Sequence, residues 1–115
     1  MARFDPETYL PLTPAMFQVL VALADGEKHG YAIGKEVARR TDGQVQLRAA
    51  TLYTVIKRFL ADDLIEESPA RPDPALDDER RRYYRLTERG RKVAVAEAQR
   101  LTETVRHARV KLKLV

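Results

Sequence analysis

The sequence has no cysteine and no tryptophan, and it has only two histidines. The missing cysteines exclude disulfides, thiolate metal sites and a cysteine nucleophile together. His29 and His107 lie far apart in the sequence, and the carboxylates near them are scattered. No glycine-rich phosphate loop follows a strand. We therefore expect neither an enzyme nor a metal site, and no cofactor.

Long apolar runs are missing as well. No run approaches about 18 residues, and no charged and then apolar leader opens the chain, so neither a membrane span nor export is indicated. The lack of cysteine fits a reducing compartment, and we expect a cytoplasmic protein with one core in its 115 residues. Lysine and arginine number 21 against 17 aspartates and glutamates. The resulting pI of about 9.6 permits a nucleic-acid partner without proving one.

The first third of the chain predicts an arm followed by a helix. Residues 1–12 hold two prolines and little periodicity, which is typical of an arm with a short turn over residues 6–10. Thr13 is a good N-cap, and Pro14 at the first helical position begins a helix that ends at the Asp-Gly pair of residues 25–26.

A second helix is predicted over about residues 30–40. Its buried face is expected to hold Tyr31, Ile33 and Val37. His29 could be a base or a ligand, but a histidine beside a helix start more often makes a structural hydrogen bond. Residues 45–47 alternate like a very short strand, and a third helix follows them. Helix, tight link and helix is the order of a helix-turn-helix motif.

Residues 48–60 predict this third helix, which has two contrasting faces. One face repeats apolar residues at 3.6 residues per turn and should point inward. Its members are Leu52, Val55, Ile56, Phe59 and Leu60. The opposite arc has hydroxyls, a ring and two cations but no carboxylate, and consists of Thr51, Tyr53, Thr54, Lys57 and Arg58. Such an arc suits a polyanion, although an ordinary surface helix can carry the same arc merely solvated.

Arg48 stands at the N-cap position of the third helix, where it cannot accept a hydrogen bond from the helix amides as serine or aspartate would. A phosphate is one candidate partner for these amides, because helix N-termini bind anions and Arg48 adds a positive charge.

Two strands joined by a long loop follow. Residues 64–68 and 82–86 predict an antiparallel pair, and the proline-containing loop between them is typical of a wing tip. The charges of this region are segregated, with Asp77, Asp78 and Glu79 before Arg80, Arg81, Arg82 and Arg85. These arginines are either a solvated run balanced by the acids or an extension of the basic surface of Lys57 and Arg58.

Thr87 can cap a last helix from Glu88 to about Leu112, roughly 37 Å long. One stripe alternates spacings of four and three, as in a coiled-coil seam. It consists of Ala94, Ala98, Leu101, Val105, Ala108, Leu112 and Val115. The seam predicts a partner helix from a second copy. Packing against the first helix of the same chain is the alternative, because three of the seven residues are only alanine, and the two can hold along different parts.

With these motifs in place, the chain resembles the PadR family of bacterial winged-helix transcriptional regulators from Leu12 to its C-terminus. The family's His-Gly-Tyr opening of the second helix corresponds to residues 29–31. Its Thr-Leu-Tyr in the recognition helix corresponds to residues 51–53, and its Lys-Arg-Leu continuation to Lys57-Arg58-Phe59. Leu64-Ile65 and residues 82–90 resemble the two wing strands. Each motif is weak alone, but their order and spacing are specific.

Two positions depart from the family pattern. Ala49-Ala50 stands where the family usually has Pro-Gly, and Asp63 stands where it usually has glycine before Leu-Ile. The first departure removes a glycine at the start of the recognition helix, where a backbone can come close to phosphate. How this end of the helix docks is therefore left open.

The resemblance implies a mostly α fold with a small β-wing, which is a winged helix-turn-helix plus a long C-terminal dimerisation helix, as in the short subfamily. We divide the chain into an N-terminal arm (1–12), a winged helix-turn-helix DNA-binding domain (13–87) and a C-terminal dimerisation helix (88–115). The implied partners are double-stranded DNA with a two-fold operator and a second copy in a homodimer. Many relatives are repressors relieved by a small-molecule effector, whose identity the sequence does not give.

Eight residues are expected at the DNA: Arg48, Thr51, Tyr53, Thr54, Lys57, Arg58, Arg81 and Arg82. Six are expected at the dimer interface: Ala94, Ala98, Leu101, Val105, Ala108 and Leu112. The alternative is a winged-helix adaptor that uses the same surface on a protein partner and does not bind DNA. The basic second strand favours DNA.

Overall fold

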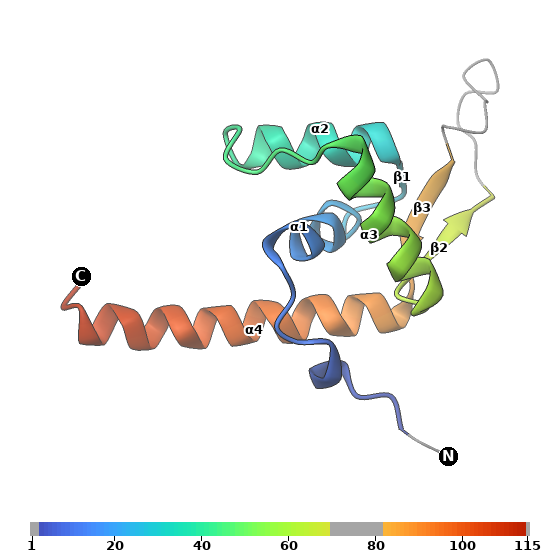
Figure 1. Cartoon of the computed structure of the whole chain (residues 1–115). Coiled ribbons are helices and arrows are strands. Elements are labelled where there is room, and N and C mark those ends of the chain that lie inside the picture. Colours follow the sequence, from blue (N-terminus) through green and yellow to red (C-terminus); the bar gives the residue numbers. More distant parts are fainter. Residues whose placement is uncertain (1–2, 70–81, 115) are drawn as a thin grey trace.

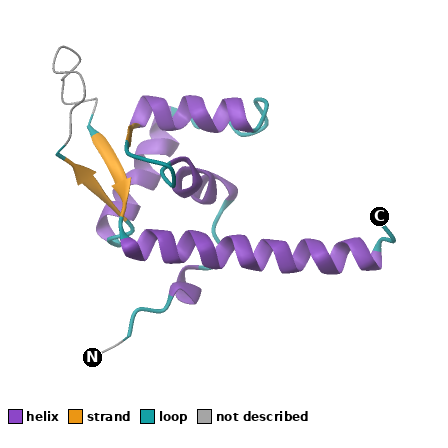
Figure 2. Ribbon diagram, turned by 180° about the vertical axis from the view of Figure 1, so that it is seen from behind, coloured by secondary structure: helices purple, strands orange, loops and turns teal. Residues whose placement is uncertain are grey.

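The computed structural model describes residues 3–69 and 82–114. Within them the chain is mostly helical with one small antiparallel sheet, as predicted (Figures 1 and 2). The elements in order are η1 (Pro6–Tyr9), α1 (Pro14–Ala22), β1 (Lys28–His29), α2 (Gly30–Arg40), α3 (Ala49–Ala61), β2 (Ile65–Ser68), β3 (Tyr83–Leu86) and α4 (Glu88–Lys111).

Local capping explains where three of the helices begin. The Thr13 hydroxyl accepts from the amide of Met16 at 3.1 Å, with Pro14 at the first helical position of α1. The Nδ1 atom of His29 accepts from the amide of Ala32 at 3.1 Å, and the Thr87 hydroxyl starts α4 in the same way. The structural role predicted for His29 is therefore confirmed.

The sheet has the order β1-β3-β2, with Lys28 opposite Tyr84 and Ile65 opposite Leu86. The strand predicted at residues 45–47 is wrong. The amide of Val45 is held by the Thr41 hydroxyl at 3.0 Å, which turns this segment back onto the end of α2 and away from any strand edge. The third strand is β1 instead, because it lies along the outer edge of β3.

One apolar core joins α1, α2, α3, the sheet and the first half of α4. Its largest fully buried apolar side chains include Leu20, Ile33, Phe59 and Leu64. The inward face of α3 is confirmed at Leu52, Val55, Ile56 and Phe59 but is wrong at Leu60, which is 38% exposed. Leu60 lies about 80° around the helix from Leu52, at the edge of the stripe.

Tyr31 also departs from the prediction, because its side chain is 63% exposed. The residues of α2 that face the core are Gly30, Ile33 and Val37. Tyr31 follows Gly30 directly, which turns it about 100° away from that face. The side chain therefore stands in solvent at the start of α2.

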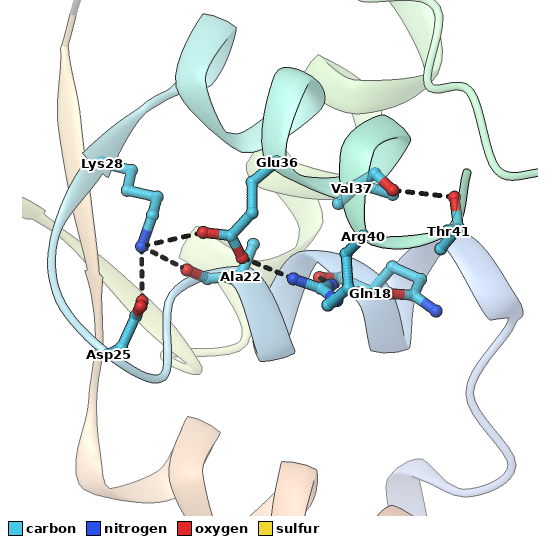
Figure 3. A network of polar contacts seen from close by, with 8 residues as sticks. All are labelled: Gln18, Ala22, Asp25, Lys28, Glu36, Val37, Arg40 and Thr41. Atoms are coloured by element: carbon cyan, nitrogen blue, oxygen red, sulfur yellow. Dashed lines mark hydrogen bonds and ion pairs between the residues drawn. The ribbon is translucent and has the colours of Figure 1, made fainter. Parts of the chain in front are cut away.

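A polar network joins the end of α1, β1 and α2 (Figure 3). The Lys28 ammonium donates to the Ala22 carbonyl at 2.7 Å and lies 3.4 Å from the Glu36 carboxylate. Arg40 pairs with Glu36 and also donates to the Gln18 side chain at 2.6 Å. These contacts close the end of α1 with a side chain from the next element and fix how α2 crosses α1.

Helix α4 has two parts that differ in their surroundings. Its first half packs on the domain through Gly90, Val93 and Glu97, and η1 lies along it. Its second half extends away from the other elements toward the C-terminus (Figures 1 and 2). None of the helices described for residues 3–69 and 82–114 is both long and apolar enough to cross a membrane.

Candidate nucleic-acid interface

Helix α3 presents the predicted polar arc to solvent. Thr51, Tyr53, Thr54, Lys57 and Arg58 are all exposed, while the apolar residues between them are buried. The Thr54 hydroxyl donates to the Ala50 carbonyl at 2.8 Å, so its proton is engaged within the helix and its lone pairs face outward. The arc offers side chains of several lengths without a carboxylate.

Tyr53 is positioned by a glycine on the neighbouring helix. A Cβ atom added at Gly30 would lie 2.8 Å from the Tyr53 hydroxyl oxygen and 3.1 Å from the nearest ring carbon. The ring can therefore lie against α2 only because Gly30 has no side chain. Its exposed fraction of 41% leaves part of it available to a partner. This contact explains in physical terms why a glycine follows His29.

The N-terminus of α3 has no side-chain cap, as predicted from Arg48. Arg48 has an extended backbone, and within the described residues its side chain forms no ion pair. The first amides of α3 and the backbone of Arg48 thus lie together at one end of the polar arc. Helix N-termini carry a partial positive charge, so this end is electropositive.

Ion pairs separate the cations of the interface into two groups. Arg58 lies 3.8 Å from Asp62, and in the wing Arg82 lies 3.7 Å from Glu67 while Arg85 lies 2.8 Å from Glu66. Lys35, Arg48 and Lys57, by contrast, have no carboxylate partner within the part of the chain that is described. The charge that is least compensated therefore lies on α2 and α3. The basic edge predicted for the second wing strand is partly offset by β2.

The antiparallel pair of wing strands predicted over residues 64–68 and 82–86 is confirmed, and its strands are β2 and β3. Arg82 precedes β3 and is exposed, whereas Arg81 lies outside the described residues, as do Asp77 to Arg80. Tyr84 of β3 is buried, and burial together with the nearby Glu67 carboxylate raises the pKa of its phenol above the usual value. It is a neutral part of the core.

The stripe predicted as a dimer seam is largely uncovered in the single chain. Val105 is 53% exposed and Leu112 is 66% exposed. Ala94, Leu101 and Ala108 are half-buried and Ala98 is exposed, while Val115 lies outside the described residues. The intramolecular alternative holds only for the first half of α4, through the adjacent face of Val93 and Glu97.

Glu97 is a buried carboxylate that sequence reasoning missed. It is 1% exposed, its Oε2 atom accepts from the amide of Leu12 at 2.6 Å, and its Oε1 atom pairs with Arg100. The bond from Arg100 lowers the pKa of Glu97, and the Leu12 amide adds to the effect against the cost of burial. A glutamate on the core-facing side of a helix was the available signal.

Metal binding finds no support in this geometry. Across residues 3–69 and 82–114, no three histidine, cysteine, aspartate or glutamate side chains are grouped closely enough to hold a metal ion. Glu97 is already bound by an amide and a guanidinium, and His29 acts as a helix cap.

Comparison with known proteins identifies this arrangement. Residues 19–96 match the Transcriptional regulator PadR-like family. An uncharacterized protein of Lysinibacillus sphaericus is 33% identical over 73 residues, which span 64% of this chain and 64% of that relative.

Solved structures are similar over more of the chain. A transcriptional regulator of Clostridium thermocellum is 27% identical, with a TM-score of 0.62 over 88% of this chain and 89% of that one. A PadR family transcription regulator of Clostridium difficile is 22% identical, with a TM-score of 0.69 over 87% and 98% of the two chains. H. salinarum RosR is 21% identical, with a TM-score of 0.67 over 92% and 93%. The last two likenesses show a shared fold.

Proposed function

The chain belongs to the PadR-like family of transcriptional regulators, and from that premise we propose that it binds DNA in a sequence-specific way as a homodimer on a two-fold operator. Regulators of this family are not enzymes, which agrees with the sparse catalytic inventory of the sequence. The proposal assigns residues 13–87 to DNA binding and residues 88–115 to dimerisation, with residues 1–12 as an arm.

The observation that carries the proposal is the polar arc of α3. All five of its residues are exposed, none of them is a carboxylate, and Lys57 and Arg48 form no ion pair with described residues. In helix-turn-helix proteins the N-terminal part of the recognition helix meets base edges in the major groove. Thr51, Tyr53 and Thr54 occupy that part, so we assign them to base reading.

Lys57, Arg58 and Arg82 are assigned to phosphate contacts, with Arg48 at the helix N-terminus and Arg81 in the wing. The proposed homodimer uses the seam of α4. The exposure of Val105 and Leu112 in the single chain supports this assignment. We propose repression relieved by a small-molecule effector as the mode of control, because the family resemblance implies it. We also propose that the protein acts in the cytoplasm, because a chain without cysteine fits a reducing compartment.

Selection of bound genomic fragments followed by sequencing tests this function. The wild-type chain should enrich a short inverted repeat, and its affinity for the enriched duplex should fall steeply with salt because phosphate contacts release counterions. No enrichment, or an affinity that hardly changes between two salt concentrations, would contradict the proposal. A protein partner captured by the α3 surface would then favour the adaptor alternative.

A further inference from the structure

Tyr31 is an aromatic side chain held in solvent at the start of α2. Its ring is stacked on His29, with centroids 6.2 Å apart and planes at 18°, and His29 in turn meets the edge of Tyr83 at 5.3 Å. The Lys35 ammonium lies 5.1 Å from the centre of the Tyr31 ring. A side chain already ordered by such contacts loses little further freedom when it binds a partner.

A hollow of about 390 Å³ lies between Tyr31 and the recognition helix. Tyr31 and Lys35 line it from α2, and Ala49 and Tyr53 line it from the first turns of α3. Its surface is mainly apolar because Ala38, Leu47 and Leu52 also line it, and Gly30 and Gly34 leave the space open because they have no side chains. The hollow thus opens beside the polar arc of α3.

The charges around the hollow suit an anion. Lys35 forms no ion pair with any described residue, whereas the nearby Lys28 and Arg40 are both paired with Glu36. The hollow therefore combines an ammonium and a phenol hydroxyl, both hydrogen-bond donors, with an apolar wall. A phosphodiester joined to a deoxyribose has the complementary chemistry.

We propose that Tyr31 and Lys35 form a second DNA contact, in which they hold one backbone phosphate while the sugar beside it covers the hollow. The inference rests on the proposed function and extends it, because none of the residues assigned to DNA so far lies on α2. In helix-turn-helix proteins the helix before the recognition helix crosses the DNA backbone, which is where this contact would act. Its role is positioning, so it should not distinguish sequences.

Fluorescence anisotropy with the enriched operator and with a random duplex, each at several salt concentrations, tests the contact. Lys35→Ala should weaken both duplexes about tenfold and make the salt slope shallower by about one unit. Tyr31→Phe keeps the ring and its stacking but removes the hydroxyl, and it should also weaken both duplexes, by several-fold to about tenfold, without changing the slope.

Lys92→Ala is the control for a lysine elsewhere on the surface. It also removes one exposed ammonium, but Lys92 is paired with Glu88 at 3.5 Å and lies beside Pro6 and Glu7, on the side of α4 that faces η1. Its binding should stay within about twofold of wild type if only long-range charge is lost. Because Tyr31 and Lys35 are exposed, all three variants should also unfold close to the wild-type temperature.

Two failures can be told apart in this design. If Lys35→Ala behaves like Lys92→Ala, or Tyr31→Phe binds both duplexes as wild type does, the second contact is overturned while DNA binding through α3 stands. If the wild-type chain binds neither duplex, the proposed function itself fails. A loss confined to the operator would also contradict the inference, because it would mean that these residues read sequence.

Discussion

Lys57 and Arg58 are adjacent on α3 but differ in their surroundings. Arg58 has Asp62 within 3.8 Å, whereas Lys57 has no carboxylate partner in the described part of the chain. Lys57→Ala should therefore weaken operator and random DNA alike and lower the salt slope by about one unit. Tyr53→Phe should instead weaken the operator more than random DNA, because Tyr53 lies in the first turns of α3, which we propose read the bases.

Competition binding at two salt concentrations measures both effects. Arg58→Ala serves as the control, because a cation already near a carboxylate should change the slope less than Lys57 does. The assigned roles are reversed if Lys57→Ala relaxes the choice of sequence while it leaves non-specific binding and the salt slope untouched.

Gly90 and Gly34 both lie inside helices, yet a methyl group at each meets different surroundings. A Cβ atom at Gly90 would lie 1.8 Å from the Leu64 carbonyl oxygen, whereas at Gly34 the nearest atom is 3.9 Å away. Gly90→Ala should therefore destabilise the fold by more than about 2 kcal/mol, since α4 must move away from the Leu64 backbone just before β2. Gly34→Ala should raise stability by about 0.5 kcal/mol through helix propensity. Urea unfolding of both variants measures these changes. Equal unfolding midpoints for Gly90→Ala and Gly34→Ala would contradict the predicted clash at Gly90.

Glu97 should make stability depend on pH in the acid range. Its pKa is lowered in the folded chain by the Arg100 bond, so the unfolded chain takes up the proton first. The stabilisation is complete above about pH 4.3 and is lost as the pH falls through the lower folded value. Thermal unfolding between pH 7 and about pH 3 should show this loss in wild type and a flatter curve in Glu97→Gln.

Glu103→Gln is the control for this measurement. Glu103 also pairs with an arginine one turn later, and the bond from Arg106 also lowers its pKa. It is 56% exposed, however, so solvent screens the pair and its removal should leave the acid slope nearly unchanged. If stability depended on pH equally in Glu97→Gln and Glu103→Gln, the burial of Glu97 would not contribute to the acid dependence of stability.

At the scale of elements, the second half of α4 carries apolar side chains that no other part of the described chain covers, such as Val105 and Leu112. Leu101→Glu with Val105→Glu should convert a two-chain particle into a one-chain particle at micromolar concentration, because both changes place charges in the seam. Light scattering measures the mass. The control is Val95→Glu with Val110→Glu, which changes exposed residues of the same helix outside the stripe. A wild-type mass of one chain, unchanged in the seam variant, would rule out the proposed seam.

At the scale of the whole molecule, the position of α3 predicts the shape of the operator. One chain extends 54 Å along its longest axis, and a two-fold dimer carries two recognition helices. The half-sites should lie about 34 to 36 Å apart or a multiple of that distance. Insertion of about five base pairs between them rotates one half-site to the opposite face and should abolish cooperative protection, whereas about ten should harm it less. A single unsymmetrical footprint, unaffected by either insertion, would contradict this geometry.

The sequence alone determined the features that depend on residues close together in the chain. Thr13 and Thr87 mark the starts of α1 and α4 because a side chain three residues away from its amide partner needs no tertiary help. The stripe of α3 predicted both its buried face and its exposed arc, since a helix converts spacing into direction. The exposure of Thr51, Tyr53 and Lys57 is confirmed, while their role at DNA stays a prediction.

Only the tertiary structure decided the features that depend on distant segments. Lys28 and His29 are a strand because β3 offers a free edge to them, and residues 45–47 are not one because Thr41 holds them elsewhere. Tyr31 carries an apolar ring, but the ring is exposed because Gly30, Ile33 and Val37 are the residues of α2 that face the core. Glu97 is buried because the Leu12 amide, 85 positions away in the sequence, lies opposite it. Periodicity records the direction of a side chain about its own helix, and it contains no information about what another segment places there.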